Sequence, residues 1–271
     1  MPHINDNGVQ VWYEVTGDGE PVMLTGGWGL IHDQFHAVRP LLADTIKMID
    51  WNYRGTGHST RDLVDPLTMD RMVDDMLMVM DHLGLEKAHL WGTSTGATIS
   101  TAFAARHPDR VKTLITFPAY AYNEASRKKA TTYVNLVRDF GYVALAKFTQ
   151  WIGCGEKNIY GAKGDDIAIF EAAAFARNFG TDELPGIIDA IYATDLTEEV
   201  KTLKMPVLML LGGSGENGAN HPKIKAGLDA FIDLCPQTET KVMDGLGGTY
   251  MLIEDPEATV PLFLEWIEAH K

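Results

Sequence analysis

The sequence has little that would cross-link or anchor a chain. Only two of its 271 residues are cysteines, Cys154 and Cys235, and neither lies in a C-x-x-C or metal-ligand spacing. We expect both to be buried, reduced thiols. No apolar run approaches the roughly 18 residues that a membrane span needs, and the first residues carry no basic and apolar leader pattern. These absences favour a soluble, cytoplasmic protein with no membrane partner.

Basic residues are in the minority. The chain has 23 Lys and Arg against 37 Asp and Glu, which gives a net charge of −14. This excess argues against nucleic acid as the main partner. The nine histidines form no H-E-x-x-H pair, and no G-x-G-x-x-G follows a predicted strand. The sequence therefore predicts neither a metal nor an organic cofactor.

Short runs rich in Val, Ile and Leu recur along the chain, as in strands buried on both faces of a parallel sheet. An Asn7-Gly8 pair before the first run suits a hairpin turn. The predicted strands are 9–15, 21–25, 44–50, 87–91, 111–117, 205–211 and 240–244.

Helical patterns lie between these strands. Apolar residues recur at helical spacing over 69–85, where the methionines are expected to pack in the core. A second helix begins at Ser94, and a third begins after Asp255, with Pro256 at its first position. The alternation predicts an α/β fold with a mostly parallel sheet flanked by helices.

The alternation breaks in one place. Residues 123–197 show helical patterns and no convincing strand, and the strand pattern resumes at 205–211. We therefore predict a core made of residues 1–122 and 198–271, with residues 123–197 inserted as a helical cap, or lid, at one end of the sheet.

The stretch Gly92-Thr93-Ser94-Thr95-Gly96 fits the pattern G-x-S-x-G. It lies between a predicted strand and a predicted helix, which is the context that a nucleophile elbow requires. The glycines allow a sharp turn, and the helix N-terminus favours negative charge on an attacked oxygen. Ser94 is therefore predicted to be a nucleophile. The structural alternative is a serine that caps a helix in a Gly-rich turn.

With this elbow in place, the chain resembles the α/β-hydrolase fold along nearly its whole length, in its lid-bearing serine esterase and lactonase branch. Further landmarks appear in order: an oxyanion loop in LTGGWGLIHDQF, a turn in DWNYRGTGHST, a Pro-led strand in LKMPVLMLLGG and a helix start in IEDPEA. The resemblance implies an eight-stranded sheet.

The resemblance also implies an oxyanion hole. Its two backbone N–H donors would come from Gly27 and from Thr95, the residue after the nucleophile, and two such donors supply several kcal/mol of transition-state stabilisation. Thr25 stands where a structural histidine is usual. Trp28, beside Gly27, is predicted either to line the substrate pocket or to pack in the core.

The catalytic acid and base follow from the same resemblance. Glu216 lies in the loop after the strand at 205–211, where the family has its carboxylate. The histidine is missing, because Gly248-Thr249 stand where Gly-His is usual, five residues before Glu254. Threonine accepts no proton usefully at neutral pH, so the serine lacks its ordinary base.

Three explanations stay open for Thr249. In the first, His221 or His58 supplies the base. In the second, the protein works without a Ser–His relay, and tyrosines shape and protonate the cavity. In the third, the threonine is an inactivating or engineered change in a Ser–Glu–His triad. The tyrosines concerned are Tyr250, which adjoins Thr249, and Tyr53, Tyr120 and Tyr122 near predicted strand ends.

The resulting hypothesis is a serine hydrolase that cleaves an ester or lactone of a small apolar substrate through Ser94. Its general base would be altered or lost at Thr249, and Trp28 and Tyr250 would border the substrate. Two alternatives are a cofactor-free lyase or cyclase and a non-catalytic ligand receptor on the same fold. A homodimer is compatible with the sequence.

Overall fold

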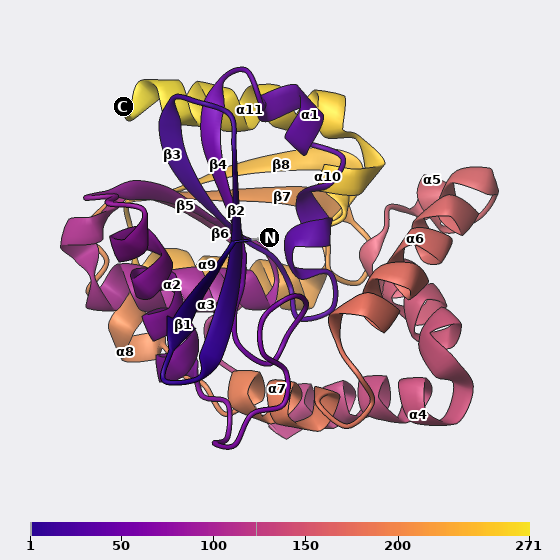
Figure 1. Cartoon of the computed structure of the whole chain (residues 1–271). Coiled ribbons are helices and arrows are strands. Elements are labelled where there is room, and N and C mark those ends of the chain that lie inside the picture. Colours follow the sequence, from indigo (N-terminus) through magenta and orange to yellow (C-terminus); the bar gives the residue numbers. More distant parts are fainter. Residues whose placement is uncertain (1, 123) are drawn as a thin grey trace.

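Eight strands form one sheet in this computed structural model, which describes residues 2–122 and 124–271 (Figure 1). The strand order is β1-β2-β4-β3-β5-β6-β7-β8. Pairing is antiparallel in β1–β2 and β2–β4 and parallel elsewhere, which confirms the predicted α/β sheet. The strands are β1 (His3–Asp6), β2 (Val9–Thr16), β3 (Glu20–Thr25), β4 (Ile46–Asn52), β5 (Ala88–Gly92), β6 (Val111–Thr116), β7 (Val207–Ser214) and β8 (Thr238–Gly247).

The predicted hairpin at Asn7-Gly8 is confirmed. Both residues have positive φ, 50° and 94°, as a tight primed turn requires. The short strand β1 before this turn has no apolar run and was not among the predicted strands. It pairs with β2 along the edge of the sheet.

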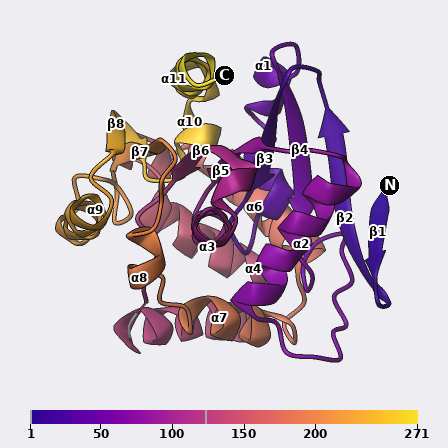
Figure 2. The same cartoon turned by 90° about the vertical axis from the view of Figure 1, so that its left-hand side faces the viewer.

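Helices cover both faces of the sheet (Figure 2). Helices α1 and α11 lie on one face, where Phe263 of α11 stacks on Trp91 of β5 with ring centroids 4.2 Å apart. Helices α2, α3, α8 and α9 lie on the other face. Their bounds are α1 (Arg39–Leu42), α2 (Met69–His82), α3 (Thr95–Arg106), α8 (Thr197–Val200), α9 (Pro222–Leu234), α10 (Met251–Glu254) and α11 (Pro256–Ala269).

The segment between β6 and α8 is helical, as predicted, and lies along the right side and the bottom of Figure 1. Helix α4 changes direction at Gly141, whose φ of 80° is not helical. Residue 123, the predicted first residue of the cap, lies outside the described residues, as does residue 1. The helices are α4 (Glu124–Gly153), α5 (Glu156–Ile159), α6 (Ala162–Asn178) and α7 (Leu184–Tyr192).

A buried carboxylate joins this helical segment to the end of β8. Glu254 accepts hydrogen bonds from the backbone N–H groups of Gly155 and Gly247 and from the side-chain amide of Asn158. These three donors satisfy the charge that burial would otherwise penalise. The turn between α4 and α5 is thereby held against the strand that leads to Thr249.

Two smaller predictions are also settled. Cys154 and Cys235 are both free thiols and both buried. Asp255 caps α11 by accepting from the N–H of Ala258, with Pro256 in the first turn. Within the described part of the chain, no helix is long and apolar enough to cross a membrane.

Candidate active site

Ser94 lies at a strained turn between β5 and α3. Its φ and ψ are 51° and −122°, a conformation that a serine rarely adopts. The flanking glycines are required by close backbone packing, because a Cβ on Gly96 would lie 1.8 Å from the carbonyl oxygen of Thr25 and one on Gly92 would lie 2.4 Å from that of Gly96. The local geometry is that of a nucleophile elbow.

Two adjoining cavities border this serine. Their volumes are about 90 Å³ and about 200 Å³. Both cavities are lined by Ser94 and Thr249, so the vacant base position lies on the same space as the predicted nucleophile. The other residues that line both are Trp28, Tyr133 and Asn217.

Trp28 lines both cavities and also packs against other aromatic rings. Its ring is nearly parallel to that of Phe175, at a centroid distance of 6.0 Å, and lies 5.4 Å from that of Tyr133. Phe175 lies on α6 and Tyr133 on α4, so the tryptophan joins the oxyanion loop to the helical segment. Both alternatives considered for this residue from the sequence therefore apply.

The two expected oxyanion donors differ in their surroundings. Thr95 is the first residue of α3, where a backbone N–H has no intrahelical acceptor. The N–H of Gly27 already donates to Oε1 of Gln34, at 3.0 Å. A Cβ on Gly27 would lie 3.4 Å from the Ser94 hydroxyl, so this loop packs directly against Ser94. Gln34, which also lines the smaller cavity, therefore occupies the Gly27 N–H that the sequence predicts as an oxyanion donor.

Neither alternative histidine lies at the site. Among the described residues, no histidine lines either of the two cavities. His58 instead packs against the rings of Trp12 and His32, near the hairpin edge of the sheet. His221 caps α9. The structure thus gives no support to the replacement of the missing base by another histidine.

Glu216 is not brought to Ser94. Its side chain is 50% exposed, and its carboxylate lies 3.5 Å from Nε2 of His221. The next residue, Asn217, lines both cavities instead, and its carbonyl oxygen would be 2.2 Å from a Cβ on Gly248. The loop after β7 does meet the loop after β8, as expected, but it presents an amide there and turns the carboxylate away.

A different carboxyl group lines the smaller cavity. Glu171 of α6 is fully buried, accepts a hydrogen bond from the hydroxyl of Tyr250 and lies 3.2 Å from Oγ1 of Thr149. All three residues line the cavity with Ser94. Burial raises the pKa of the Glu171 carboxyl to about 8, although the two hydroxyls oppose this shift. The buried surroundings of Glu171 therefore favour its protonated form.

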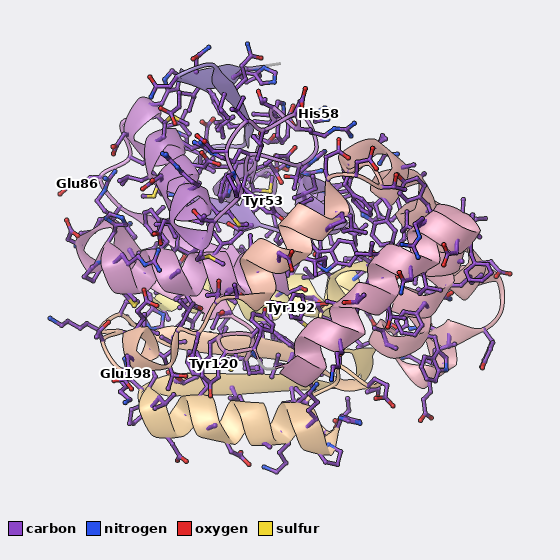
Figure 3. The ribbon with its side chains drawn as sticks, turned by 90° about the horizontal axis from the view of Figure 1, so that it is seen from below. Tyr53, His58, Glu86, Tyr120, Tyr192 and Glu198 are labelled. Atoms are coloured by element: carbon purple, nitrogen blue, oxygen red, sulfur yellow. The ribbon has the colours of Figure 1, made fainter. Side chains whose placement is uncertain are left out.

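The remaining candidate tyrosines are dispersed. Tyr122 lines the larger cavity, where its hydroxyl lies 2.8 Å from Oγ1 of Thr98, and burial raises its pKa to about 12. Tyr53 and Tyr120 do not line either cavity. In Figure 3, Tyr53 lies in the upper half of the view with His58, whereas Tyr120 lies in the lower half, below Tyr192. Of the tyrosines predicted from the sequence, Tyr250 and Tyr122 border the Ser94 space.

Sequence reasoning missed several residues that line the site, among them Gln34, Asn217 and Glu171. Gln34 and Asn217 each lie within a recognised loop, and their position beside a landmark was the available signal. Glu171 lies in a helix whose sequence, FEAAAF, resembles any amphipathic pattern, so no signal distinguished it. Across residues 2–122 and 124–271, no group of three or more His, Cys, Asp or Glu side chains is arranged to hold a metal ion.

Comparison with known proteins agrees with this fold. A family profile described as alpha/beta hydrolase fold matches residues 20–154, about half of the chain. A protein of Caulobacter sp. (strain K31) named "Putative carbamate hydrolase RutD" is 27% identical over 211 residues, which are 73% of this chain and 76% of that protein.

Solved structures share the whole architecture. A thermophilic esterase from Thermogutta terrifontis is similar at a TM-score of 0.80 and 24% identity, with all of both chains covered. The enol-lactonase from Burkholderia xenovorans LB400 is similar at a TM-score of 0.81 and 19% identity, with 98% of this chain and all of that chain covered. These likenesses concern the fold. With its mostly parallel eight-stranded sheet and strained elbow, the chain belongs to the α/β-hydrolase fold superfamily.

Proposed function

We propose that the protein hydrolyses an ester or lactone of a small, largely apolar substrate, with Ser94 as the nucleophile. The observation that carries this proposal is the positive φ of Ser94 at the start of α3, on the border of two cavities. Strained backbone of this kind persists only where the surrounding structure enforces it, and it is concentrated at functional sites.

In the proposed reaction, Oγ of Ser94 attacks the carbonyl carbon of the substrate. The Thr95 N–H lies at the positive end of α3 and stabilises the negative charge on the carbonyl oxygen. A second donor becomes available when the substrate oxygen displaces Oε1 of Gln34 from the Gly27 N–H, or when the Gln34 amide turns and offers its own N–H group.

The size and the aromatic side chains of the larger cavity support a small substrate with an apolar part. The larger cavity is bordered by aromatic rings, including Tyr122, Tyr133 and Tyr192, and has a volume of about 200 Å³. This is below the roughly 300–1,000 Å³ of pockets that hold drug-sized ligands. A short acyl chain fits this space best. The printed name of the RutD relative adds carbamates to the substrate classes worth testing.

A fluorophosphonate probe tests the nucleophile. We expect the probe to modify Ser94, as located by mass spectrometry of the digested protein, and the Ser94→Ala variant to stay unmodified. In parallel, a panel of short-chain esters, lactones and carbamates is expected to give turnover that this substitution abolishes. An unmodified wild-type protein with no turnover on any class would contradict the proposal.

A second candidate is a cofactor-free lyase or cyclase. It is favoured by the buried carboxyl group of Glu171, whose pKa burial raises to about 8, in a site whose lining includes no histidine among the described residues. Such an enzyme would use proton transfer and form no acyl-enzyme. Turnover of a substrate that survives Ser94→Ala would favour this candidate over the hydrolase.

A further inference from the structure

Glu171 is a buried carboxyl group whose surroundings differ from those of the other buried acids. Asp50 and Asp75 are each paired with an arginine, Arg39 and Arg54. Glu254 accepts from two backbone N–H groups and an amide. Among the described residues, the hydrogen-bond partners of the Glu171 carboxyl are two hydroxyls, neither of them a cation, and Glu171 is the one of these four acids that lines the smaller Ser94 cavity.

A buried carboxyl group in these surroundings lowers the stability of the fold if its only role is to fill space. Burial of a carboxyl group without a cation disfavours its ionised form, and an apolar side chain of similar size would fill the same space without that cost. Around Glu171, the titratable groups that face it are Tyr250 and the thiol of Cys154. Farther out, Glu254 and Lys163 act on Cys154.

The partners of Glu171 form a continuous hydrogen-bonded chain. Tyr250 donates to Oε1 of Glu171. The Thr149 hydroxyl lies 3.2 Å from Oε2 and within 3.1 Å of the carbonyl oxygens of Leu145 and Ala146. When the carboxyl group is protonated, it donates to Thr149, which donates to its own helix. When it is ionised, both hydroxyls donate to it. Each protonation state therefore has a satisfied arrangement.

Tyr250 connects this pair with the vacant base position. It follows Thr249 directly, and its side chain borders the same cavity as Ser94. Burial and the nearby carboxyl raise the pKa of Tyr250 well above its ordinary value, so it does not rest as a phenolate. It can nevertheless pass a proton, by giving its own to Glu171 as it accepts another.

We propose that Tyr250 and Glu171 together replace the absent histidine as the proton acceptor for Ser94. The inference rests on the proposed function, since it needs Ser94 to act as the nucleophile. As Oγ bonds to the substrate carbonyl carbon, the serine proton moves to the Tyr250 hydroxyl and the tyrosine proton moves to the Glu171 carboxylate. The carbonyl π electrons move to oxygen.

The same pair then returns the proton. When the tetrahedral intermediate collapses, the bond between the carbonyl carbon and the leaving oxygen breaks, and that oxygen takes a proton from Tyr250. Tyr250 is reprotonated by Glu171, which becomes a carboxylate again. A water molecule repeats the sequence to release the acid and restore the Ser94 hydroxyl, so atoms and charge balance over the cycle.

The relay predicts a distinctive pH dependence. Only the ionised carboxyl can accept the proton, and the pKa of Glu171 is raised to about 8. The rate of acylation is therefore expected to rise through this pH and to level off above it. A histidine base with an ordinary pKa near 6.5 would level off about one and a half units lower.

The test measures acylation by p-nitrophenyl butyrate in single turnovers from about pH 6 to about pH 10. For Glu171→Gln, which keeps the size and hydrogen-bonding capacity of the side chain, we expect a roughly 100-fold lower rate at high pH and no rise near pH 8. The exposed Glu156→Gln, in α5, is the matched control and should retain the wild-type profile.

Tyr250→Phe provides an independent arm, in case the glutamine variant does not fold. It keeps the ring and should show the same loss of the rise. A wild-type profile in Glu171→Gln or Tyr250→Phe overturns the relay while leaving Ser94 as the nucleophile. A wild-type protein that neither reacts with the ester nor is modified at Ser94 by a fluorophosphonate overturns the proposed function, and the relay with it.

Discussion

The two sides of the Ser94 cavities are held in different ways. On the sheet side, Ser94 and Gly27 belong to loops packed so closely that a methyl group on Gly96 would overlap the backbone of Thr25. On the helical side, Glu171 and Thr149 are side chains of α6 and α4, and they contact the sheet domain through Tyr250. Backbone packing fixes the first side, and side-chain hydrogen bonds fix the second.

The two sides therefore contribute different features to the site: the sheet side fixes the position of Ser94, and the helical side supplies a group that can gain or lose a proton. The sheet side offers the strained serine, the Thr95 donor and neutral amides, and the carboxyl group that lines the smaller cavity comes from the helical side. Substitutions that add side-chain atoms at the close-packed glycines should therefore perturb the sheet side most. Substitutions that change charge should alter activity mainly on the helical side.

The largest effect is expected at Gly96. In Gly96→Ala the new Cβ would lie 1.8 Å from the Thr25 carbonyl oxygen, so β3, β5 or α3 must shift. We expect the free energy of unfolding to fall by about 3 kcal/mol or more, measured by chemical denaturation, with loss of Ser94 reactivity. Gly186→Ala, in α7, has no atom within 4 Å of its Cβ and should instead stabilise by about 0.5–1 kcal/mol. Equal changes in the free energy of unfolding for Gly96→Ala and Gly186→Ala would show that close backbone packing does not set the sheet side apart.

A second prediction concerns a histidine introduced on the sheet side as the general base. Thr249→His combined with Asn217→Asp places a histidine and a carboxylate on the lining that already borders Ser94. We expect ester turnover to rise by about 100-fold, because a positioned general base contributes about 10²–10⁴. In this background Glu171→Gln should change the rate by less than about threefold.

Thr249→Ala with Asn217→Asp is the control for the histidine. It should not raise turnover. If the histidine variant also gives no gain, then the loops after β7 and β8 do not form a triad around Ser94, and the hydrolase interpretation of these loops is wrong.

A third prediction concerns the oxyanion loop. Gln34→Glu places a carboxylate where the Gln34 amide now accepts from Gly27. Repulsion of the developing oxyanion is expected to lower kcat/KM by about 10- to 100-fold. Gln34→Met, which frees the Gly27 N–H without adding charge, should keep more activity than the glutamate variant. The opposite order would contradict the expected repulsion and, with it, the placement of the oxyanion beside the Gly27 N–H.

The smallest effect is expected at Glu216. Because its carboxylate is half-exposed and faces His221, Glu216→Gln should leave kcat/KM within about twofold, and the loss of a surface ion pair should cost less than about 1 kcal/mol of stability. Chemical denaturation and steady-state kinetics measure both. A loss of 100-fold or more would reinstate Glu216 as the catalytic acid.

Periodicity and local motifs predicted the sheet, most of its strands, the cap of α11 and the turn at Ser94. Each of these depends on residues close together in the sequence, so a single chain contains the signal. The edge strand β1 was missed because its four residues, HIND, carry no apolar run. Its pairing with β2 is set by the Asn7-Gly8 turn.

The site was harder to predict because it is assembled from distant segments. Family position pointed to Glu216, yet the direction of each side chain in a short loop depends on the backbone torsions, and Asn217 lines the cavities in its place. The sequence predicted Gly27 as an oxyanion donor, but it did not predict that Gln34 accepts from the Gly27 N–H. Glu171 and Tyr250 are 79 residues apart in the sequence, so no local sequence pattern predicts their hydrogen bond.

The bonds made by Glu254 restrict how this fold can be recombined. One carboxylate serves Gly155 in the helical segment and Gly247 at the end of β8, so the two segments share a single acceptor. A chimera that grafts the helices of a relative onto this sheet must supply a donor in place of Gly155. Otherwise the buried carboxylate of Glu254, next to the loop that carries Thr249, keeps fewer hydrogen-bond donors than it has here.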